Sequence, residues 1–465
     1  MSENVMVQLR SDWTDARISL PESICEKLGL KERHVLVAFG TFRRKVRCIQ
    51  DATMGKQLRI SSTLARSMGL VHQDQIKVKY SKGVLTLGPL IAIFTNGAIG
   101  KVRPFGEQTK FLRELSEQSK EKHYLVCVFA TKDVHWERRQ IHGRVAQIDQ
   151  EGNIAWQRRK LPFPNVFYDR FITYRLQKPD LALKRKLLRQ VIPFFNGVIG
   201  DKAVMHQKYL SHPQLRPHLP ETKEFRHNLL QPWLSKYRVL YIKPRMGTQG
   251  KGIIRIAKQK DGYQAFCVSK GGPMKTFNTK SLAALKLKIL TWMQGVKCII
   301  QQGISLATVD GRNVDYRVLV QKGIDGRWQI TGMVARLGRK GSVVNNIHGG
   351  GDVLDVHSAL DSYFGDNSPL TQQIIADLEK VTKLVSQVCD RDQRYLGELG
   401  VDLGVDVNGR VWVIEANPKP GRSVFSRVKA YELRRQAVIQ PMNYAAYIAG
   451  FGIPRSKGED GNETV

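Results

Sequence analysis

The chain has 465 residues and a formal net charge of +33, from 74 Lys and Arg against 41 Asp and Glu. Its apolar content of 42%, without low-complexity tracts, indicates a globular protein of several domains. The longest apolar stretches, such as Leu90–Phe94 and Leu125–Ala130, are too short to span a bilayer, and residues 1–10 lack a signal-peptide core. An integral helical membrane protein is therefore excluded, and we expect a cytoplasmic protein, with assembly onto a larger structure left open.

The positive charge favours an anionic partner: a nucleotide, an acidic peptide, a polyanionic wall polymer or a nucleic acid. Lys and Arg are spread along the whole chain, and their local clusters carry no recognisable nucleic-acid fold signature, which favours a generally basic surface. No C-x-x-C pair indicates a zinc site, so we expect reduced core thiols at Cys25, Cys48, Cys127, Cys267, Cys298 and Cys389.

The first 88 residues contain an internal duplication. Residues 20–40 align without gaps on residues 60–80, and each copy predicts a strand end, a short helix, a Gly C-cap, a turn and an alternating strand. Neither copy can bury its apolar face alone, so we expect the two to interlock into a small β-barrel that resembles swapped-hairpin or double-psi barrels. Such barrels host many functions, so this one implies an accessory domain and no particular chemistry. The matched positions are Leu20/Ile60, Ile24/Leu64, Leu28/Met68, Gly29/Gly69 and Leu30/Leu70.

After residue 88 the pattern changes to strands that alternate with helical segments. We expect a small α/β domain over residues 89–197, a larger domain over 198–452 and a polar, frayed tail over 453–465. The predicted fold class is therefore a multidomain α+β or α/β chain with a duplicated, barrel-like N-terminal domain.

A glycine-rich loop interrupts residues 238–258. A strand ends at Lys243-Pro244, the loop carries Gly247, Gly250 and Gly252, and a β-branched strand follows. A Walker A loop would open a helix, so this pattern predicts a strand–loop–strand flap whose backbone N–H groups can close over phosphates. Lys243 would add a point charge to the same phosphates, and an ordinary glycine hairpin with a surface lysine is the alternative.

One amphipathic helix is expected from Pro369 onward, with Ser368 as its N-cap. The apolar residues of this helix form one stripe, which predicts that it packs on a sheet: Ile374, Leu378, Val381, Val385 and Val388.

The segment from residue 398 to residue 417 carries acids inside apolar strands. Asn408-Gly409 predicts a two-residue type I′ hairpin, in which the numbers of paired residues sum to 817. Asp402 then lies opposite Glu415, and Gly404 opposite Val413. The same register places Asp402, Gly404 and Asp406 on one face with Val411, Val413, Glu415 and Asn417.

Two carboxylates directly opposite each other repel, and a divalent cation removes the conflict. Asp, Glu and Asn oxygens are hard ligands of the kind that Mg²⁺ prefers, with phosphates completing its coordination. Gly404, between the two acids, would leave room for a ligand over the sheet. A protonated acid, or a register shifted by one residue, is the alternative.

Together these motifs resemble the ATP-grasp superfamily and, within it, the YheC/YheD endospore coat-associated family, whose ATP-grasp part is similar to RimK-type ligases. The resemblance implies a C-terminal ATP-grasp fold that binds ATP and Mg²⁺. Lys202 and Lys243 match its two phosphate-binding lysines, and residues 298–304 match the strand that hydrogen-bonds adenine through its backbone. The cofactor-binding residues it implies are Lys202, Lys243, Gly247, Gly250, Gly252, Gln301, Gln302, Gly303 and Ile304, and the implied metal ligands are Asp402, Glu415 and Asn417.

The resemblance also implies residues around the transferred phosphate. Arg317 lies in a D-x-R strand at the phosphate-contacting position, and Arg336, Asn346 and His348 match the region around that phosphate and the acceptor. Gln302 replaces a Glu that many ATP-grasp enzymes carry, and the Glu that commonly holds the ribose is not evident among residues 305–308.

The first hypothesis is an ATP-dependent carboxylate–amine ligase that acts through an acylphosphate on unknown carboxylate and amine substrates, such as a peptide or a wall or coat component. The second is an ATP-binding coat-assembly protein without turnover, whose basic surface binds an anionic spore or wall layer. A nucleic-acid-associated protein built on the N-terminal barrel is the third.

Overall fold

The computed structural model describes the chain with short gaps and divides it into two compact units. Unit 1 comprises residues 1–197, 322–327 and 435–465, and unit 2 comprises residues 198–321 and 328–434. The described residues are 2–97, 100, 103–148, 154–171, 186, 188–247, 250–268, 274–338, 351–366, 368–391, 396–422, 424–425 and 431–453. Among the helices of this described part, none is long and apolar enough to cross a membrane.

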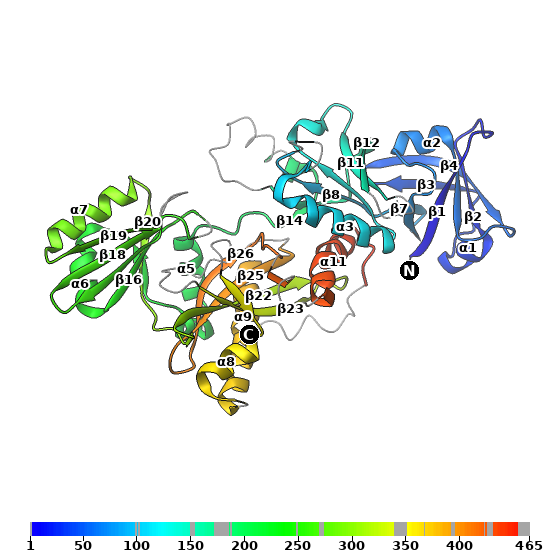
Figure 1. Cartoon of the computed structure of the whole chain (residues 1–465). Helices are drawn as coiled ribbons and strands as arrows, with labels where there is room; N and C mark the ends of the chain where they lie inside the picture. The colour runs from blue at the N-terminus through cyan, green and yellow to red at the C-terminus, as the bar shows by residue number, and fades with distance from the viewer. Residues whose placement is uncertain are drawn as a thin grey trace. The chain divides into compact units, whose positions relative to one another are not determined.

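Unit 1 begins with a closed barrel in the strand order β1-β5-β2-β4-β3-β7-β6, which confirms the predicted barrel (Figure 1). Short helices α1 and α2 end at equivalent left-handed glycines, Gly29 with φ 68° and Gly69 with φ 69°, as the duplication predicts. The elements are β1 (Glu3–Arg10), β2 (Arg17–Pro21), α1 (Glu22–Leu28), β3 (His34–Phe39), β4 (Phe42–Asp51), β5 (Gln57–Ser61), α2 (Ser62–Met68), β6 (Gln75–Ser81) and β7 (Val84–Gly88).

The second sheet of unit 1 has the order β10-β11-β9-β8-β13-β14, and β12 pairs with β11. One face shares a hydrophobic core with the barrel, and the other is covered by α3 and by the C-terminal helix α11. The elements are β8 (Leu90–Phe94), α3 (Thr109–Glu121), β9 (Leu125–Phe129), β10 (Val134–His135), β11 (Gln140–Ile148), β12 (Ile154–Pro162), β13 (Val166–Asp169), β14 (Phe194–Phe195) and α11 (Tyr431–Ile448).

A buried ion pair joins the barrel to this sheet. The Arg159 guanidinium of β12 donates to both carboxylate oxygens of Asp74, at 2.8 and 2.9 Å, and both side chains are buried. Because a buried charge is tolerated only when it is paired, this contact fixes how the barrel sits on the sheet.

The first sheet of unit 2 has the order β15-β20-β16-β17-β18-β19. Helices α6 and α7 pack on its apolar face, where Leu240, Ile242 and Ile300 are fully buried. The elements are α5 (Lys202–Leu210), β15 (Thr222–Glu224), α6 (Leu230–Lys236), β16 (Val239–Pro244), β17 (Ile254–Gln259), β18 (Gly262–Val268), β19 (Met274–Thr279), α7 (Leu282–Met293) and β20 (Cys298–Gln302).

The second sheet of unit 2 has the order β24-β23-β22-β25-β26, and β21 pairs with β22. Helix α9 covers its apolar face with the predicted stripe from Ile374 to Val388, all of it buried, and Ser368 Oγ accepts the N–H of Leu370 at 3.2 Å. The elements are β21 (Thr308–Val309), β22 (Arg312–Lys322), β23 (Trp328–Leu337), β24 (Asp352–Leu354), α8 (Val356–Phe364), α9 (Pro369–Arg391), β25 (Glu398–Val405) and β26 (Val411–Asn417). Four short 3-10 helices complete the described elements: Gly106–Gln108, Thr131–Asp133, Pro213–His218 and His227–Leu229.

All six cysteines are buried free thiols, as the sequence predicts. Burial raises the pKa of the Cys48 and Cys127 thiols to about 12, so these groups stay protonated and unreactive.

Candidate functional site

The polar face of the second sheet of unit 2 is where the predicted site residues gather. In β22 and β25 apolar side chains alternate with charged ones, so Val318, Val401 and Leu403 point to the α9 core. Arg317 and Asp402 lie directly opposite each other on neighbouring strands. The alternation of a β-strand therefore collects the charges on the other face.

Helix α5 begins at Lys202 because Asp201 caps it. The Asp201 carboxylate accepts the backbone N–H groups of Ala203 and Val204 at 2.9 and 3.1 Å, which satisfies two unpaired donors of the first turn. Arg245, just after β16, donates to the other carboxylate oxygen at 2.7 and 3.0 Å. The cap and the arginine together tie the start of α5 to the glycine-rich loop.

Lys202 brings three segments of unit 2 together. Its Nζ lies 3.3 Å from Glu415 Oε1 in β26 and donates to the carbonyl oxygen of Gly247 at 3.0 Å. The lysine of α5 that is predicted to bind phosphate, the glycine-rich loop and a predicted metal ligand therefore meet at one point.

Lys243 lies beside this point in β16. Its Nζ donates to Gln301 Oε1 at 2.6 Å, and Gln301 Nε2 donates to the Thr222 hydroxyl at 2.9 Å. Burial lowers the pKa of Lys243 to about 8, Glu415 opposes this shift, and the charge of Lys202 adds to it. Lys243 is thus mainly cationic at neutral pH, and an anion beside it would stabilise the charge.

The glycine-rich segment is strand–loop–strand, as predicted. β16 and β17 pair as antiparallel strands, with Leu240 opposite Ile256. Gly247, Gly250 and Gly252 have φ of 146°, 70° and 77°, values that L side chains rarely adopt.

In the acid hairpin Asp402 pairs with Glu415, as predicted, but the turn and the register near it differ from the prediction. The turn is a three-residue loop over residues 407–409, in which Asn408 keeps a negative φ, Gly409 has φ 84°, and Asp406 N–H donates to Arg410 O at 3.0 Å. Paired numbers sum to 816 next to the turn, and an irregularity between Asp402 and Leu403 restores 817 at the acids. The two-residue type I′ turn is therefore wrong.

The register correction changes which side chains share a face. Gly404 pairs with Trp412, and Val411 and Val413 pair with Val405 and Leu403 in the α9 core, so the expectation that both valines share the acid face is wrong. The space above Gly404 is also not free. An added Cβ would lie 2.6 Å from Leu306 Cδ2, so this glycine accommodates Leu306 and not a ligand.

Asp402 is compensated by arginines. The Arg317 guanidinium donates to both of its oxygens, with Nη2 at 2.8 Å from Oδ2, and Arg336 Nη2 lies 3.0 Å from Oδ1. Arg336 Nε also donates to Asp315 Oδ1 at 2.5 Å. The result is a buried chain of alternating charges in the order Arg317, Asp402, Arg336, Asp315.

The two acids of this chain differ in proton affinity. Burial raises the pKa of Asp315 to about 6, against the opposing effect of Arg336. Burial also tends to raise the pKa of Asp402, but the charges and hydrogen bonds of Arg317 and Arg336 outweigh this effect, so the pKa of Asp402 is lowered. Asp402 therefore stays ionised near neutral pH.

The donor set of the acid hairpin fits Mg²⁺. Glu415 is partly exposed, with 36% of its side chain accessible, and Asn417 Oδ1 accepts Lys419 N–H at 2.9 Å while a second lone pair remains. Asp402 uses three of about four carboxylate lone-pair positions for guanidinium groups, which leaves one. The candidate set consists of two acids and one amide. Across the described ranges, no group of three or more His, Cys, Asp or Glu side chains is placed to hold a metal ion.

The strand predicted to hydrogen-bond adenine already uses some of its hydrogen-bonding groups within the protein. Gln302 N–H donates to Glu221 O at 2.9 Å, and Gln302 Oε1 accepts Glu221 N–H at 3.1 Å. Gly303 N–H donates to Val239 O at 2.9 Å, and an added Cβ there would lie 2.7 Å from Val239. The backbone N–H groups of Gln302 and Gly303 are thus used within the sheet, and an adenine contact through Ile304 stays a prediction.

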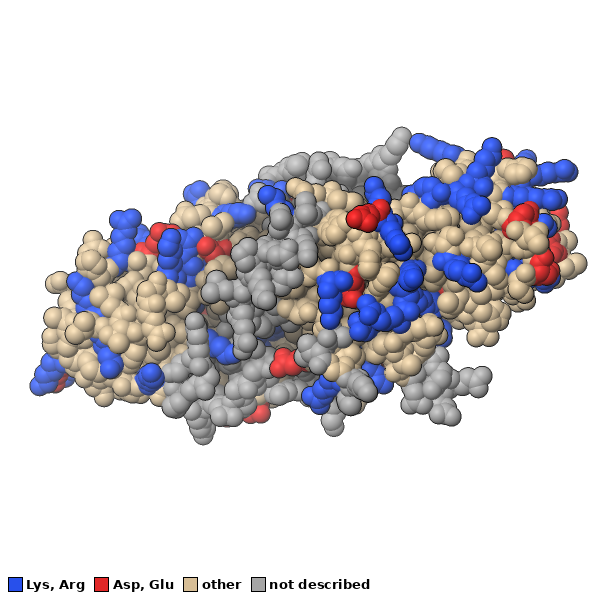
Figure 2. Space-filling view, turned by 90° about the horizontal axis from the view of Figure 1, so that it is seen from above, with Lys and Arg blue, Asp and Glu red and all other residues tan. Residues whose placement is uncertain are grey.

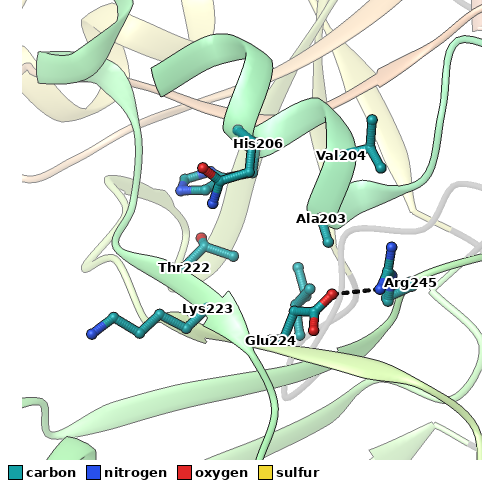
Figure 3. A pocket seen from close by; sticks show the side chains of 9 residues that line it. Ala203, Val204, His206, Thr222, Lys223, Glu224 and Arg245 are labelled. Carbon is teal, nitrogen blue, oxygen red and sulfur yellow. Dashed lines mark hydrogen bonds and ion pairs between the residues drawn. The ribbon is translucent and has the colours of Figure 1, made fainter. Parts of the chain in front are cut away.

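A cavity of about 280 Å³ lies between α5, β15 and β20 (Figure 3). Ala203, Val204 and Ile299 give it apolar walls, while Glu224 and Arg245 pair with each other at its rim. His206 also lines the cavity and is only 8% exposed. Burial lowers the pKa of its imidazole. Ala203, which lines the cavity, directly follows Lys202 in α5.

Asn346 and His348 lie outside the described residues. The sequence reasoning also missed two charged partners of the site. Asp315 lies two residues before Arg317 in the same strand, and this i, i+2 spacing was the available signal. Glu398 accepts hydrogen bonds from Arg422 and, at 3.0 Å, from Gln321, and no local spacing indicated this contact.

Two antiparallel sheets that bring two lysines and an acid pair to one place define the class of ATP-grasp proteins. A family model described as YheC/D like ATP-grasp matches residues 191–448, more than half of the chain, and the chain therefore belongs to this family.

The chain is similar to two proteins of Bacillus subtilis (strain 168). It is 26% identical to the endospore coat-associated protein YheD over 430 residues, which is 90% of this chain and 92% of YheD. It is 26% identical to the endospore coat-associated protein YheC over 315 residues, 65% of this chain and 83% of YheC. Among solved structures, D-cycloserine synthetase DcsG has a TM-score of 0.47 at 12% identity, over 76% of this chain and 99% of that chain.

Proposed function

We propose that the chain is an ATP-dependent carboxylate–amine ligase that acts through an acylphosphate. The observation that carries the proposal is the contact between Lys202 and Glu415 at 3.3 Å, with Lys243 beside it. Cations for a triphosphate and acids for its metal then lie within one site. A protein that kept the fold for structural reasons alone would not need to place both there.

In the proposed reaction a substrate carboxylate oxygen attacks the γ-phosphorus of ATP, and the bond from that phosphorus to the bridging oxygen breaks. ADP leaves, and the carboxylate becomes an acylphosphate. An amine then attacks the acyl carbon, loses a proton, and inorganic phosphate departs with the C–O electron pair. Positioning and charge neutralisation suffice for the phosphoryl step, so no protein nucleophile is required.

Each charged group has a role in this scheme. Lys202 and Lys243 neutralise the phosphates, and the flap amides around Gly250 cover them. Arg317 and Arg336 would stabilise the transferred phosphoryl group, a role that the resemblance also implies for Asn346 and His348. Asp402, Glu415 and Asn417 would hold Mg²⁺, which supplies charge neutralisation and orientation of the phosphate oxygens.

The test is magnesium-dependent release of ADP in a screen of amino-acid, peptide and amine acceptors, with mass detection of the product. Glu415→Ala should abolish release, while Glu379→Ala, an acid on α9, should leave it unchanged. A protein that binds no ATP at millimolar concentrations overturns the proposal.

A second candidate function is that of an ATP-binding coat-assembly protein without turnover, associated with the spore coat. The names of the two Bacillus relatives, both endospore coat-associated proteins, and the net charge of +33 favour it. It predicts ATP binding that no acceptor in the screen converts into ADP release.

A further inference from the structure

Basic side chains lie directly opposite each other on the β11–β12 ribbon of unit 1. The register pairs Arg144 with Arg158 and His142 with Lys160. Ile141 and Val145, which alternate with these residues on β11, point into the core shared with the barrel, so the four cationic or titratable side chains lie on the opposite face. Like charges directly opposite each other destabilise a sheet.

The histidines extend this row onto β10. The ring centroids of His135 and His142 lie 3.8 Å apart. Burial lowers the pKa of His142, and His135, Lys160 and Arg158 act in the same direction, against Asp133. The ring therefore resists a further positive charge, as expected beside other cations. We call His135, His142, Arg144, Arg158 and Lys160 the cationic row.

Carboxylates are scarce around the cationic row. Among the acids that the structure describes, Asp133 contacts the row, through a hydrogen bond from Arg158 Nη2 at 3.0 Å. Among the described residues Arg144 and Lys160 form no ion pair, whereas the neighbouring Arg159, on the buried face, pairs with Asp74. Figure 2 shows Lys and Arg side chains gathered on the visible face of the part of the chain that forms unit 1.

In the described part of the chain, strand β12 pairs on one side only, and its other edge is called the free edge below. Its nine residues pair with β11, and no other described strand pairs with it. The carbonyl oxygen of Lys160 is covered, because a Cβ added at Gly69 would lie 2.2 Å from it. The open stretch therefore runs from Ile154 to Arg159, where Ala155 and Gln157 are exposed.

We propose that the free edge of β12 and the cationic row form a docking surface for an extended acidic peptide. The peptide adds a strand beside residues 154–159, and its backbone pairs with the unpaired groups of that edge. Alternate Asp or Glu side chains then face Arg158 and Lys160, while Arg144 adds attraction from the neighbouring strand β11. This proposal rests on unit 1 and does not depend on ATP turnover.

An acidic peptide fits this surface better than a nucleic acid. Single-stranded nucleic acids bind by stacking bases on exposed aromatic rings. Trp156 of β12 packs edge-on against Phe105, with centroids 4.9 Å apart and planes at 83°, and the His135 and His142 rings lie against each other, tilted by 33°. These rings already contact other rings, whereas a strand edge suits a polypeptide backbone.

Fluorescence anisotropy of the full chain with a labelled ten-residue peptide of alternating Glu and Val tests the proposal. The double variant Arg158→Gln/Lys160→Gln should weaken binding by about tenfold or more, and Arg144→Gln alone by a smaller factor. The matched control Lys258→Gln/Lys260→Gln removes the same charge from exposed residues of unit 2 and should change binding by less than about twofold.

Two further probes separate the parts of the proposal. The same peptide with N-methyl groups on alternate amides keeps its charge but cannot add a strand, and should bind about tenfold more weakly. Equal binding of the N-methylated peptide overturns the docking mode. A single-stranded oligothymidine that binds more tightly than the peptide, and loses binding in the Arg158→Gln/Lys160→Gln variant, overturns the choice of partner. If no peptide binds at low salt, the charges serve to keep the edge from pairing, and the proposal is wrong.

Discussion

Replacement of Arg317 by Gln should tighten binding of a divalent cation in the absence of nucleotide while weakening binding of ATP. Arg317 Nη2 lies 2.8 Å from Asp402 Oδ2, so the guanidinium occupies part of the carboxylate that is predicted to hold a metal. The arginine and the metal compete for the same oxygens, whereas the arginine and a phosphate attract each other. The two effects of one substitution therefore have opposite signs.

The magnitude follows from charge and distance. Two unit charges about 4 Å apart interact by roughly 4 kcal/mol at the effective dielectric of a protein surface. A third of that interaction, about 1.4 kcal/mol, already changes an affinity tenfold. Since Arg336 still holds Asp402 at 3.0 Å, the variant should lose only about 2 kcal/mol of folding stability, the order of one hydrogen bond to a charged group.

Titration with Mn²⁺, in which electron paramagnetic resonance counts the free ion, measures the effect without turnover. Arg317→Gln should bind Mn²⁺ about tenfold more tightly than the parent protein and ATP about tenfold more weakly. Arg312→Gln is the control, because Arg312 lies on the same strand but pairs with Asp352 at 2.8 Å. If Arg317→Gln binds Mn²⁺ no better than the control, Asp402 is not a metal ligand.

Three further results are expected. ATP affinity should fall as the pH rises through about 8, because the cationic form of Lys243 binds phosphate and its pKa is lowered to about 8; an unchanged dissociation constant between pH 7 and pH 9.5 would place Lys243 outside the site. Asp74→Asn should lower the free energy of unfolding by about 3 kcal/mol in a denaturant titration, because it leaves Arg159 buried without a counter-charge, and a loss below about 1 kcal/mol would contradict the role of this pair. Gly303→Ala should weaken ATP binding measured by calorimetry, since the new methyl group would meet Val239 at 2.7 Å and displace the strand next to Ile304; unaltered binding would separate this strand from the nucleotide.

The parts of the fold that follow from local pattern were predictable from sequence. The α9 stripe, the left-handed glycines of the duplicated helices and the strand–loop–strand flap each depend on periodicity or on a backbone preference within a few residues. The structure confirms all three.

The turn of the acid hairpin shows why other features were not predictable. Asp406 Oδ1 accepts the N–H groups of Asn408 and Arg410 at 2.9 and 3.0 Å, and Oδ2 accepts Trp412 Nε1 at 2.9 Å. This side-chain network stabilises a longer loop than Asn-Gly alone favours. The irregularity beyond Asp402 then compensates, so the acids still meet.

The ion-pair partners were equally out of reach. Asp402 was expected to need a cation because Glu415 faces it, yet two arginines from other strands satisfy it first. Which side chain pairs with a buried charge depends on the order of the strands in the sheet and on the directions of the side chains. The spacing of residues in the sequence shows neither.

The C-terminal helix has a consequence for the order in which the chain can fold. Val438, Met442 and Tyr444 of α11 cover the same face of the second sheet of unit 1 as α3, so that face has its full cover only after about residue 446 has been made. Unit 2 is an insertion that leaves the ribosome earlier. During synthesis all residues of unit 2 are therefore made before unit 1 is complete. The apolar face of unit 1 over Ile91 and Val128 stays partly uncovered until α11 has been made.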